Sequence, residues 1–278
     1  MSRPEHVNPP ELFYDEKEAS KYNSCSRIIK VQEELSRRAI ELLNLPQDKE
    51  CFILDVGCGS GLSGVALEDA GHAWIGVDIS KDMLDIAAER DSSGDVFLQD
   101  MGGGLPFRPG IFDGCISISA VQWLCYSDKK EHSARKRLTR FFSSLYMCLK
   151  RGSRAVLQLY PETPEQMEEI STCAMRCGFS GGVVVDYPNS TKAKKFYLCL
   201  FAGSEAQQSM PQALGVSAAS DEVVFQARRE KLRQRRGKGR EAIKRKDWVM
   251  AKKDRYRKQG KDVKADSKFT GRRRPAAF

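Results

Sequence analysis

Hydrophobic and polar positions follow two alternating patterns along the chain, one typical of helices and one typical of buried strands. Over residues 26–43 apolar side chains recur every three or four positions, which predicts an amphipathic helix. The short apolar run over residues 51–56 has the composition of a strand covered on both faces of a parallel sheet. The predicted helices are 26–43, 62–69, 81–90, 138–149 and 164–177, and the predicted strands are 51–56, 73–77, 96–98, 112–118, 155–160, 182–187 and 195–201.

The order of these elements predicts the fold class. Strands that alternate with helices are typical of a doubly wound α/β fold with a mainly parallel sheet. The last two predicted strands are joined by a Pro188-Asn189-Ser190 loop with no helix between them, which indicates an antiparallel hairpin. We therefore expect a Rossmann-like α/β fold with a mainly parallel seven-stranded sheet and an antiparallel terminal hairpin.

Four regions are expected along the chain. Residues 1–50 form an N-terminal helical cap, of which the Pro-rich residues 1–25 are expected to be irregular. Residues 51–202 form the α/β domain. Small and polar residues make 203–225 a linker, and residues 226–278 form a basic tail.

The net charge of +9 conceals a strong asymmetry between body and tail. Of the 46 Lys and Arg and 37 Asp and Glu residues, 22 basic and 6 acidic ones lie in residues 226–278, which gives the tail +16 and the rest −7. Trp248, Tyr256 and Phe269 are interleaved with this charge. Basic side chains release counterions from phosphates and aromatic rings stack on unpaired bases, so the tail is expected to bind RNA.

Other interpretations of the tail remain open. Residues 233–236 and 244–246 also have the composition of nuclear localisation signals. A helix is expected over 242–259, ordered on binding. The alternative is a purely solvated charged tail.

Composition also indicates where in the cell the protein is expected and whether it holds a metal. No apolar run approaches the roughly 20 residues of a membrane span, and residues 1–15 lack the apolar core of a secretory signal, so a soluble intracellular protein is expected. The nine cysteines form no Cys-x-x-Cys pair and only three histidines are present. We therefore expect no metal site, and cysteines that act as small core residues.

The sequence LDVGCGSG over residues 54–61 is the strongest chemical signal. A buried strand leads through Gly57, Gly59 and Gly61 into a helix, and alternating glycines let the backbone turn sharply and approach a ligand. With Gly64 the motif also satisfies the dinucleotide-binding pattern, which is weak by itself. A plain strand-to-helix turn would not need this glycine density.

Three acidic residues help to distinguish the cofactors that such a loop can hold. Asp78 ends the second strand about 20 residues after the glycines, where it can accept from ribose hydroxyls or else support the next helix. Asp55 suits the cationic amino end of S-adenosylmethionine and disfavours a pyrophosphate. Asp100, between Gln99 and Met101, can accept from the adenine amine or be an ordinary loop carboxylate. The terminal hairpin, which is how methyltransferase sheets close, also favours S-adenosylmethionine.

Residues 112–124 carry a fourth strand toward the expected site. Ligands of doubly wound sheets bind beyond the carboxyl ends of the strands, which places Ser119, Gln122 and Trp123 on the methyl-transfer face. Gln122 can pair with a base edge. Trp123 can pack on the cofactor or a base, or else belong to the core.

The runs 112–125, 155–162 and 184–198 resemble the eukaryotic small-subunit ribosomal RNA (guanine-N7) methyltransferases, as do residues 9–15 and 256–273. The resemblance covers nearly the whole chain and is weakest over residues 203–226. It implies the class I S-adenosylmethionine-dependent methyltransferase fold and a guanine of 18S rRNA as the substrate, during biogenesis of the small (40S) subunit. It also implies a pre-ribosome assembly role that is partly independent of methylation.

The resemblance further implies a partner and a location. A small zinc-binding activator subunit would pair along the sheet edge as a heterodimer and cover apolar surface. The protein would lie in the nucleus, in nucleolus and nucleoplasm, and also in the cytoplasm, without a membrane partner.

Residues of the site follow from the motifs and the resemblance together. The resemblance places Lys21, Tyr22 and Arg27 where they close in the cofactor. The full set expected at S-adenosylmethionine is Lys21, Tyr22, Arg27, Asp55, Gly57, Cys58, Gly59, Gly61, Asp78, Ile79, Met83, Asp100, Met101 and Ser117.

The chemistry expected of a guanine-N7 methyltransferase needs no general base. N7 already offers an in-plane lone pair, so catalysis consists mainly of holding the reacting atoms in line. Gln122, Trp123 and Tyr160 are the residues expected to position the substrate, with Tyr14 and Tyr22 as further candidates. A small-molecule methyltransferase, which has no use for the tail, and a non-catalytic RNA-binding scaffold are the alternatives.

Overall fold

The computed structural model describes residues 3–90, 92–126, 133–190, 193–203, 209–215, 250, 253, 257 and 264–266. The chain forms two compact units, Met1–Val216 and Ser217–Phe278. In the second unit Met250, Lys253 and Arg257 are helical. The other residues of the helix predicted over 242–259 lie outside the described residues.

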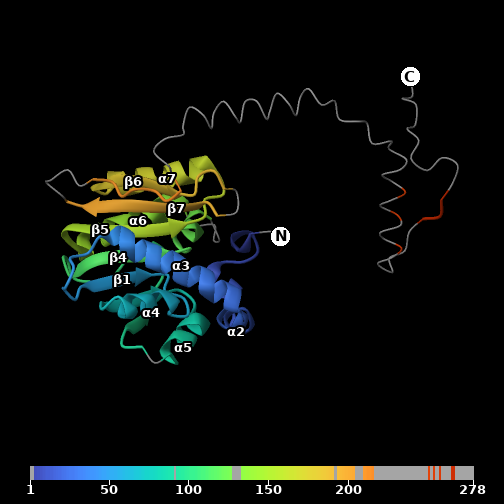
Figure 1. Ribbon diagram of the computed structural model, residues 1–278, viewed down its shortest axis with the longest axis horizontal. Helices are drawn as coiled ribbons and strands as arrows, with labels where there is room; N and C mark the ends of the chain where they lie inside the picture. Colours follow the sequence, from blue (N-terminus) through green and yellow to red (C-terminus); the bar gives the residue numbers. More distant parts are fainter. Residues whose placement is uncertain are drawn as a thin grey trace, which may run out of the picture. The chain divides into compact units, whose positions relative to one another are not determined.

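One seven-stranded sheet in the order β3-β2-β1-β4-β5-β7-β6 organises the first unit (Figure 1). Its strands are β1 Phe52–Val56, β2 Ala73–Asp78, β3 Asp95–Leu98, β4 Phe112–Ile118, β5 Leu149–Leu159, β6 Phe179–Asp186 and β7 Lys195–Ala202. From β3 to β5 all neighbours are parallel, whereas β7 is antiparallel to both β5 and β6. The predicted mainly parallel sheet with a terminal hairpin is confirmed.

Helices cover both faces of the sheet. The helices are α1 Pro10–Phe13, α2 Glu16–Ser24, α3 Ser26–Leu43, α4 Leu62–Asp69, α5 Lys81–Ala88, α6 Ala134–Cys148 and α7 Pro164–Arg176, with short 3-10 turns η1 Pro4–His6, η2 Met101–Gly103 and η3 Val121–Cys125. On one face, the cores of α3, α4 and α5 pack with Ile53 of β1. On the other face, α6 and α7 pack with the next residue of β1, Leu54. Strand residues point alternately to the two faces, so burial on both sides explains the uninterrupted apolar runs.

The structure differs from the sequence prediction at the N-terminus. Residues 1–25 were expected to be irregular, but η1, α1 and α2 occupy much of this segment. Helix α2 begins after Asp15, whose side chain accepts a hydrogen bond from the Glu18 backbone N–H at 2.9 Å. This pair is the start of a capping box, a helix signal that the prolines upstream concealed.

Strand β6 begins three residues before the predicted 182, at Phe179. Two further boundaries differ by four or more residues because polar residues interrupt the apolar pattern. Helix α6 begins at Ala134 rather than at residue 138, since its first turn is Ala-Arg-Lys-Arg and carries no apolar periodicity. Strand β5 begins at Leu149 rather than at residue 155, through the exposed residues 150–152.

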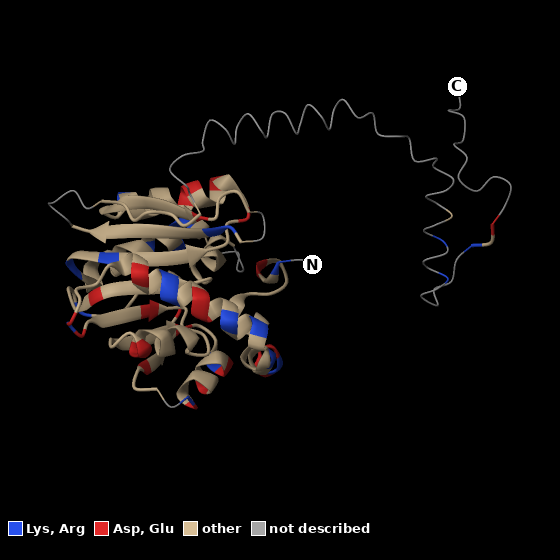
Figure 2. Ribbon diagram, in the orientation of Figure 1, with Lys and Arg blue, Asp and Glu red and all other residues tan. Residues whose placement is uncertain are grey.

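Charged residues of this unit gather on helices and loops, while the strands are mostly uncharged (Figure 2). Along α3 the two signs interleave. Six of the nine cysteines are buried, in agreement with their expected role in the core. Among the described residues, no helix has both the length and the apolar character needed to span a membrane.

Candidate active site

A pocket lies beyond the carboxyl ends of β1, β2 and β4, where a doubly wound sheet places its ligands. Segments that are far apart in the sequence build its wall. They are the loop and start of α4 (Gly57, Cys58, Gly59, Ser60, Leu62, Ser63), the end of β2 and α5 (Val77, Asp78, Ile79, Met83), Gln99, Asp100 and Met101, the turn after β4 (Ile118, Ser119, Ala120, Trp123, Leu124), Arg137, and the N-terminal Pro10, Tyr14, Tyr22 and Gln32.

The glycines of the loop after β1 are required by its geometry. Gly57, Gly59 and Gly61 have φ values of 74°, 53° and 80°, in the left-handed region that other residues rarely adopt. A Cβ on Gly57 would also lie 2.2 Å from the Cβ of Ala120. The loop from β1 therefore touches the turn from β4, and only glycine fits between them.

Gly64 serves a different purpose. A Cβ at this position in α4 would lie 2.1 Å from Cζ2 of Trp74, so the glycine makes room for the indole between helix and strand. Close helix–strand packing is the ordinary role of the third glycine in such motifs.

Asp55 lies beneath the glycine loop with no exposed surface, so it stands behind the residues that line the pocket. Its Oδ2 accepts a hydrogen bond from Ser63 Oγ at 2.5 Å, while its Oδ1 is buried without a hydrogen-bond partner among the described residues. Burial raises the pKa of Asp55 to about 7. The hydrogen bond from Ser63 acts in the opposite direction, and the negative charge of Asp78 adds to the increase. A buried acceptor of this kind is suited to a cationic group, such as the ammonium of S-adenosylmethionine.

Asp78 ends β2 and lines the pocket. Its Oδ2 accepts from the Gly59 N–H at 2.9 Å and its Oδ1 from the Ser80 N–H at 2.8 Å. Burial raises the pKa of Asp78 although these backbone donors lower it. The carboxylate thus supports the start of α5, and each oxygen has lone pairs left for a ribose hydroxyl.

Asp100 caps η2 at the pocket wall. Its Oδ1 accepts from the Gly102 N–H at 2.9 Å and from the Arg137 guanidinium at 2.6 Å. Arg137 was not expected at the site, because it lies in a run of basic residues where no spacing distinguishes it from solvated neighbours.

Aromatic rings close the pocket on the side of the N-terminus. The ring centroids of Phe13 and Tyr14 each lie 6.0 Å from that of Trp123, and Tyr22 lies 6.1 Å from Tyr14. Burial raises the pKa of the Tyr14 and Tyr22 phenols, with nearby Asp78 adding to both, so the two rings stay neutral. These rings meet edge to face or tilted, and together they form an apolar wall whose phenol hydroxyls can donate hydrogen bonds.

Several residues expected at the site lie behind the pocket wall. The Gln122 side chain is buried and donates from Nε2 to the Ser119 carbonyl at 2.7 Å, so its amide faces its own turn. Ser117 Oγ donates to the Val56 carbonyl at 2.6 Å and joins β4 to β1. Gly61 packs toward Ala87 of α5.

Three others lie at the periphery. Lys21 is exposed and pairs with Glu18 at 3.0 Å, and Arg27 is also exposed. Tyr160 follows β5 and is half-buried, with the Lys195 ammonium 5.2 Å from its ring centroid. The pocket therefore brings together the glycine loop, Asp78, Ile79, Met83, Asp100, Met101, Tyr22 and Trp123.

Comparison with known proteins gives two family models. The model described as "Methyltransferase domain" matches residues 54–157, and "Methyltransferase involved in Williams-Beuren syndrome" matches residues 200–276.

Curated relatives match the chain from end to end. The 18S rRNA (guanine-N(7))-methyltransferase of Mus musculus is 55% identical over 280 residues, which is 99% of this chain and 98% of the relative. The probable 18S rRNA (guanine-N(7))-methyltransferase of Dictyostelium discoideum is 52% identical, with all of both chains covered. The 18S rRNA (guanine(1575)-N(7))-methyltransferase of Saccharomyces cerevisiae is 46% identical, again with all of both chains covered.

Solved structures agree with the fold. A TehB-like SAM-dependent methyltransferase from Corynebacterium glutamicum is 17% identical with a TM-score of 0.51, covering 68% of this chain and 100% of that one. Phosphoethanolamine N-methyltransferase 2 of Haemonchus contortus, in complex with S-adenosyl-L-methionine, is 16% identical with a TM-score of 0.53, covering 73% of this chain and 61% of that one. At these identities the similarity shows the architecture alone, which is that of class I S-adenosylmethionine-dependent methyltransferases.

Proposed function

The chain belongs to the family of 18S rRNA (guanine-N(7))-methyltransferases, and from this premise we propose that it transfers a methyl group from S-adenosylmethionine to N7 of a guanine in 18S rRNA. One observation carries the proposal: relatives named for this activity match the chain at 46% identity or more over its whole length, basic tail included. A small-molecule methyltransferase or a scaffold without activity would not account for both the site and the tail.

The described residues fit the cofactor. Asp78, which lines the pocket, would accept from the ribose hydroxyls, and Asp55, whose unpartnered oxygen is buried behind the glycine loop, would hold the ammonium group. Asp100 and Met101 would contact the adenine, and Gly57 lets the backbone approach the ligand. When bound, S-adenosylmethionine supplies a methyl group on a positively charged sulfur.

The remaining task of the protein is to orient the base. Guanine N7 offers a lone pair in the plane of the ring, so no side chain has to remove a proton before attack. Holding two reactants in the reactive geometry can supply several kcal/mol, up to roughly 7–11 in favourable cases. Trp123, Tyr14 and Tyr22 form the aromatic wall that a base would contact, and Tyr160 is a further positioning candidate.

An activator subunit is the second part of the proposal. Strand β3 is an edge of the sheet, and two of its large apolar side chains are exposed, Phe97 by 49% and Leu98 by 61%. Unpaired edges with exposed apolar residues are typical docking surfaces for another chain. The small zinc-binding activator that the resemblance implies would pair here.

The biological setting completes the proposal. The relatives named above are eukaryotic enzymes of rRNA, which is consistent with a nuclear and nucleolar location and some presence in the cytoplasm. The substrate would be the 18S rRNA of the pre-40S particle, held in part by the +16 tail over residues 226–278. An assembly role in that particle follows from the same binding.

Mapping N7-methylguanosine in 18S rRNA tests the proposal in cells that carry either the native protein or Gly57→Glu. A side chain at Gly57 collides with Ala120, so the variant should bind no cofactor and the modification should disappear. Gly103→Ala is the matched control, because a Cβ at Gly103 meets nothing within 4 Å.

Thermal melting of the purified variant, together with calorimetric titration of S-adenosylmethionine, separates a blocked site from a misfolded protein. Undiminished methylation by the folded Gly57→Glu protein would contradict the proposal.

A further inference from the structure

The N-terminal strap, residues 3–14, crosses the carboxyl ends of the strands that build the pocket. It contains η1 and α1, and Pro10 and Tyr14 line the pocket. Both of its ends are fastened to the α/β domain, but by different kinds of contact.

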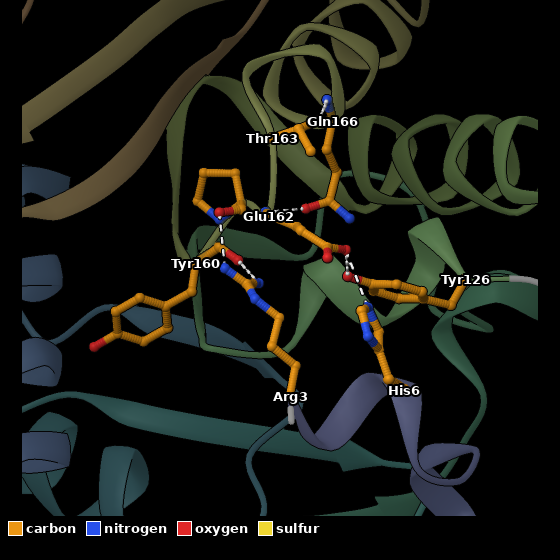
Figure 3. Close-up of polar contacts among 8 residues, drawn as sticks. Arg3, His6, Tyr126, Tyr160, Glu162, Thr163 and Gln166 are labelled. Carbon is orange, nitrogen blue, oxygen red and sulfur yellow. Dashed lines mark hydrogen bonds and ion pairs between the residues drawn. The ribbon is translucent and has the colours of Figure 1, made fainter. Parts of the chain in front are cut away.

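At its beginning the strap is held by a guanidinium (Figure 3). Arg3 donates from one terminal nitrogen to the Tyr160 carbonyl at 2.9 Å and from the other to the Pro161 carbonyl at 3.1 Å. The planar fork of arginine suits two acceptors side by side. These carbonyls belong to the loop that leaves β5.

Glu162, in the same loop, is the second fastening point (Figure 3). Its Oε2 accepts from the Tyr126 hydroxyl at 2.8 Å and lies 3.1 Å from Nε2 of His6. The Tyr126 and His6 contacts lower the pKa of Glu162, which favours the charged form. The Glu162 backbone N–H donates to Gln166 of α7 at 2.7 Å, so the carboxylate is presented from a fixed position.

At its other end the strap is held by contacts between aromatic rings. Phe13 and Tyr14 pack on Trp123, which is 6% exposed, and the Tyr14 carbonyl accepts from Ser80 Oγ at 2.9 Å. Ser80 in turn caps the first turn of α5.

The sheet order shows what the strap covers. Ser80 follows β2 and Glu162 follows β5, and between these strands lie β1 and β4. The glycine loop directly follows β1, and the turn that contains Trp123 follows β4. A segment fastened after β2 and after β5 therefore bridges the part of the sheet edge where the cofactor would lie.

From this arrangement, and resting on the proposed function, we propose that Arg3 and Glu162 are positioning residues that fasten the strap over the cofactor pocket, so that cofactor exchange requires their contacts to open. The His6 and Glu162 side chains are 42% and 37% exposed, whereas Trp123, on which Phe13 and Tyr14 pack, is buried. Exposed hydrogen bonds exchange readily with water, so this end opens first and the strap turns about Phe13 and Tyr14.

The test compares full-length Arg3→Ala, Glu162→Gln and the double variant with the native protein, each with its activator subunit where that is needed for solubility. The release of bound S-adenosylhomocysteine is followed in a stopped-flow chase, and Trp123 beneath the strap serves as a fluorescent reporter. Release from the double variant should be at least about threefold faster, as expected for the loss of several hydrogen bonds. The KM for S-adenosylmethionine should rise, with the melting temperature of the cofactor-free protein little changed.

Glu168→Gln on α7 and Arg108→Ala are matched controls, because both residues are exposed and lie outside the strap contacts; their release rates should equal the native one. An unchanged release rate in the folded double variant overturns the inference. A lower melting temperature with an unchanged release rate also overturns it, since that result describes a merely structural contact. Native protein that binds no S-adenosylmethionine at all contradicts the proposed function instead, so the two failures are distinguishable.

Discussion

Asp55 is a carboxylate whose surroundings oppose its charge in the cofactor-free protein. Burial raises its pKa to about 7, whereas an aspartate in an unfolded chain has a pKa of roughly 3.9. Between these values the folded protein binds more protons than the unfolded chain. By linkage, the contribution of Asp55 to stability is complete below the lower value and is lost as the pH rises through about 7.

Asp55→Asn should therefore act in opposite directions on stability and on binding. At pH 8 the cofactor-free variant should be more stable than the native protein by roughly 1–2 kcal/mol, because a buried charge is removed. Its affinity for S-adenosylmethionine should fall by about tenfold or more, because the ammonium loses a charged acceptor. Denaturant titrations at pH 5 and pH 8 and calorimetry measure the two effects.

The exposed Asp69→Asn in the neighbouring α4 is the control for the loss of one negative charge. It should alter neither quantity. An affinity for the cofactor that survives intact in Asp55→Asn would show that Asp55 does not hold the ammonium group.

Residues of the site can be predicted from the sequence where the local backbone conformation requires one residue type. Gly57, Gly59 and Gly61 could be identified because left-handed φ values favour glycine, and the alternating glycines directly after a predicted strand indicate such a loop. Gln122 was expected to face a base, but its amide bonds the Ser119 carbonyl. Ser119 itself adopts a φ of 58°, and the direction of a side chain after such a turn depends on tertiary packing that periodicity does not contain.

Glu68 joins three elements at the end of α4. Its Oε1 accepts from Trp74 Nε1 of β2 at 2.8 Å, from Ser92 Oγ at 2.7 Å and from the Ser93 N–H at 2.7 Å, ahead of β3. Burial pushes the pKa of Glu68 up, but these donors outweigh it and lower the pKa to about 2. The contribution to stability is present above the usual value for glutamate and is lost as the pH falls toward 2.

Glu68→Gln should lower the free energy of unfolding by roughly 1–2 kcal/mol at pH 7, because hydrogen bonds to a charged acceptor are weakened. The difference from the native protein should shrink as the pH falls from about 4.5. Urea titrations at several pH values measure it, with the exposed Glu89→Gln as the control. A difference that is independent of pH would show that the carboxylate charge is not what holds this junction.

Arg38 and Asp186 form a buried pair that fastens α3 to β6. The side chains are 10% and 2% exposed, and Arg38 donates through Nε at 2.9 Å and through a terminal nitrogen at 3.2 Å. The same pair holds residues 209–215: Arg38 donates to the Gln212 carbonyl and Asp186 accepts from the Leu214 N–H, each at 2.8 Å.

Arg38→Ala should cost about 3–5 kcal/mol of stability, because Asp186 is left as a buried charge without its partner. Residues 209–215 should also lose protection in hydrogen exchange. The adjacent Arg37→Ala is the matched control, since Arg37 is exposed on the same helix, and it should leave both quantities unchanged. Equal protection of residues 209–215 in the two variants would refute the anchoring role.

At the scale of elements, predictability follows the range of the interactions that define each element. Helix α4 could be predicted with its observed bounds because glycines border it on both sides. Residues 10–24 could not, because α1 and α2 are short and the contacts of Phe13 and Tyr14 reach Trp123 and Ser80, more than 50 residues away. The mainly parallel sheet and its antiparallel terminal hairpin could be predicted because they follow from the alternation of strands and helices along the chain and from the rules of chain connection.

At the scale of the whole molecule, charge divides the chain into two parts with different tasks. The residues outside the tail carry −7 and hold the cofactor pocket, whereas residues 226–278 carry +16. Within the described part of the tail, Asp266 pairs with Lys253 at 2.7 Å and with Arg257 at 2.6 Å. With 22 basic residues against 6 acidic ones, most of the positive charge cannot be matched within the tail and is available for phosphates.

Deleting residues 226–278 should therefore abolish most association with pre-ribosomal RNA while cofactor binding is retained. Each phosphate contact to a single strand contributes roughly −0.7 to the slope of log K against log salt, so the truncated protein should show both a lower affinity and a shallower slope.

Replacing Trp248, Tyr256 and Phe269 together by alanine keeps every charge. That variant should lose affinity with an unchanged slope, because only stacking is removed. Binding of 18S rRNA fragments across a salt series measures both changes, and calorimetry with S-adenosylmethionine verifies the pocket. A truncated protein that still sediments with pre-ribosomal particles at the native level would assign RNA binding to the α/β domain, and the tail would then have another role.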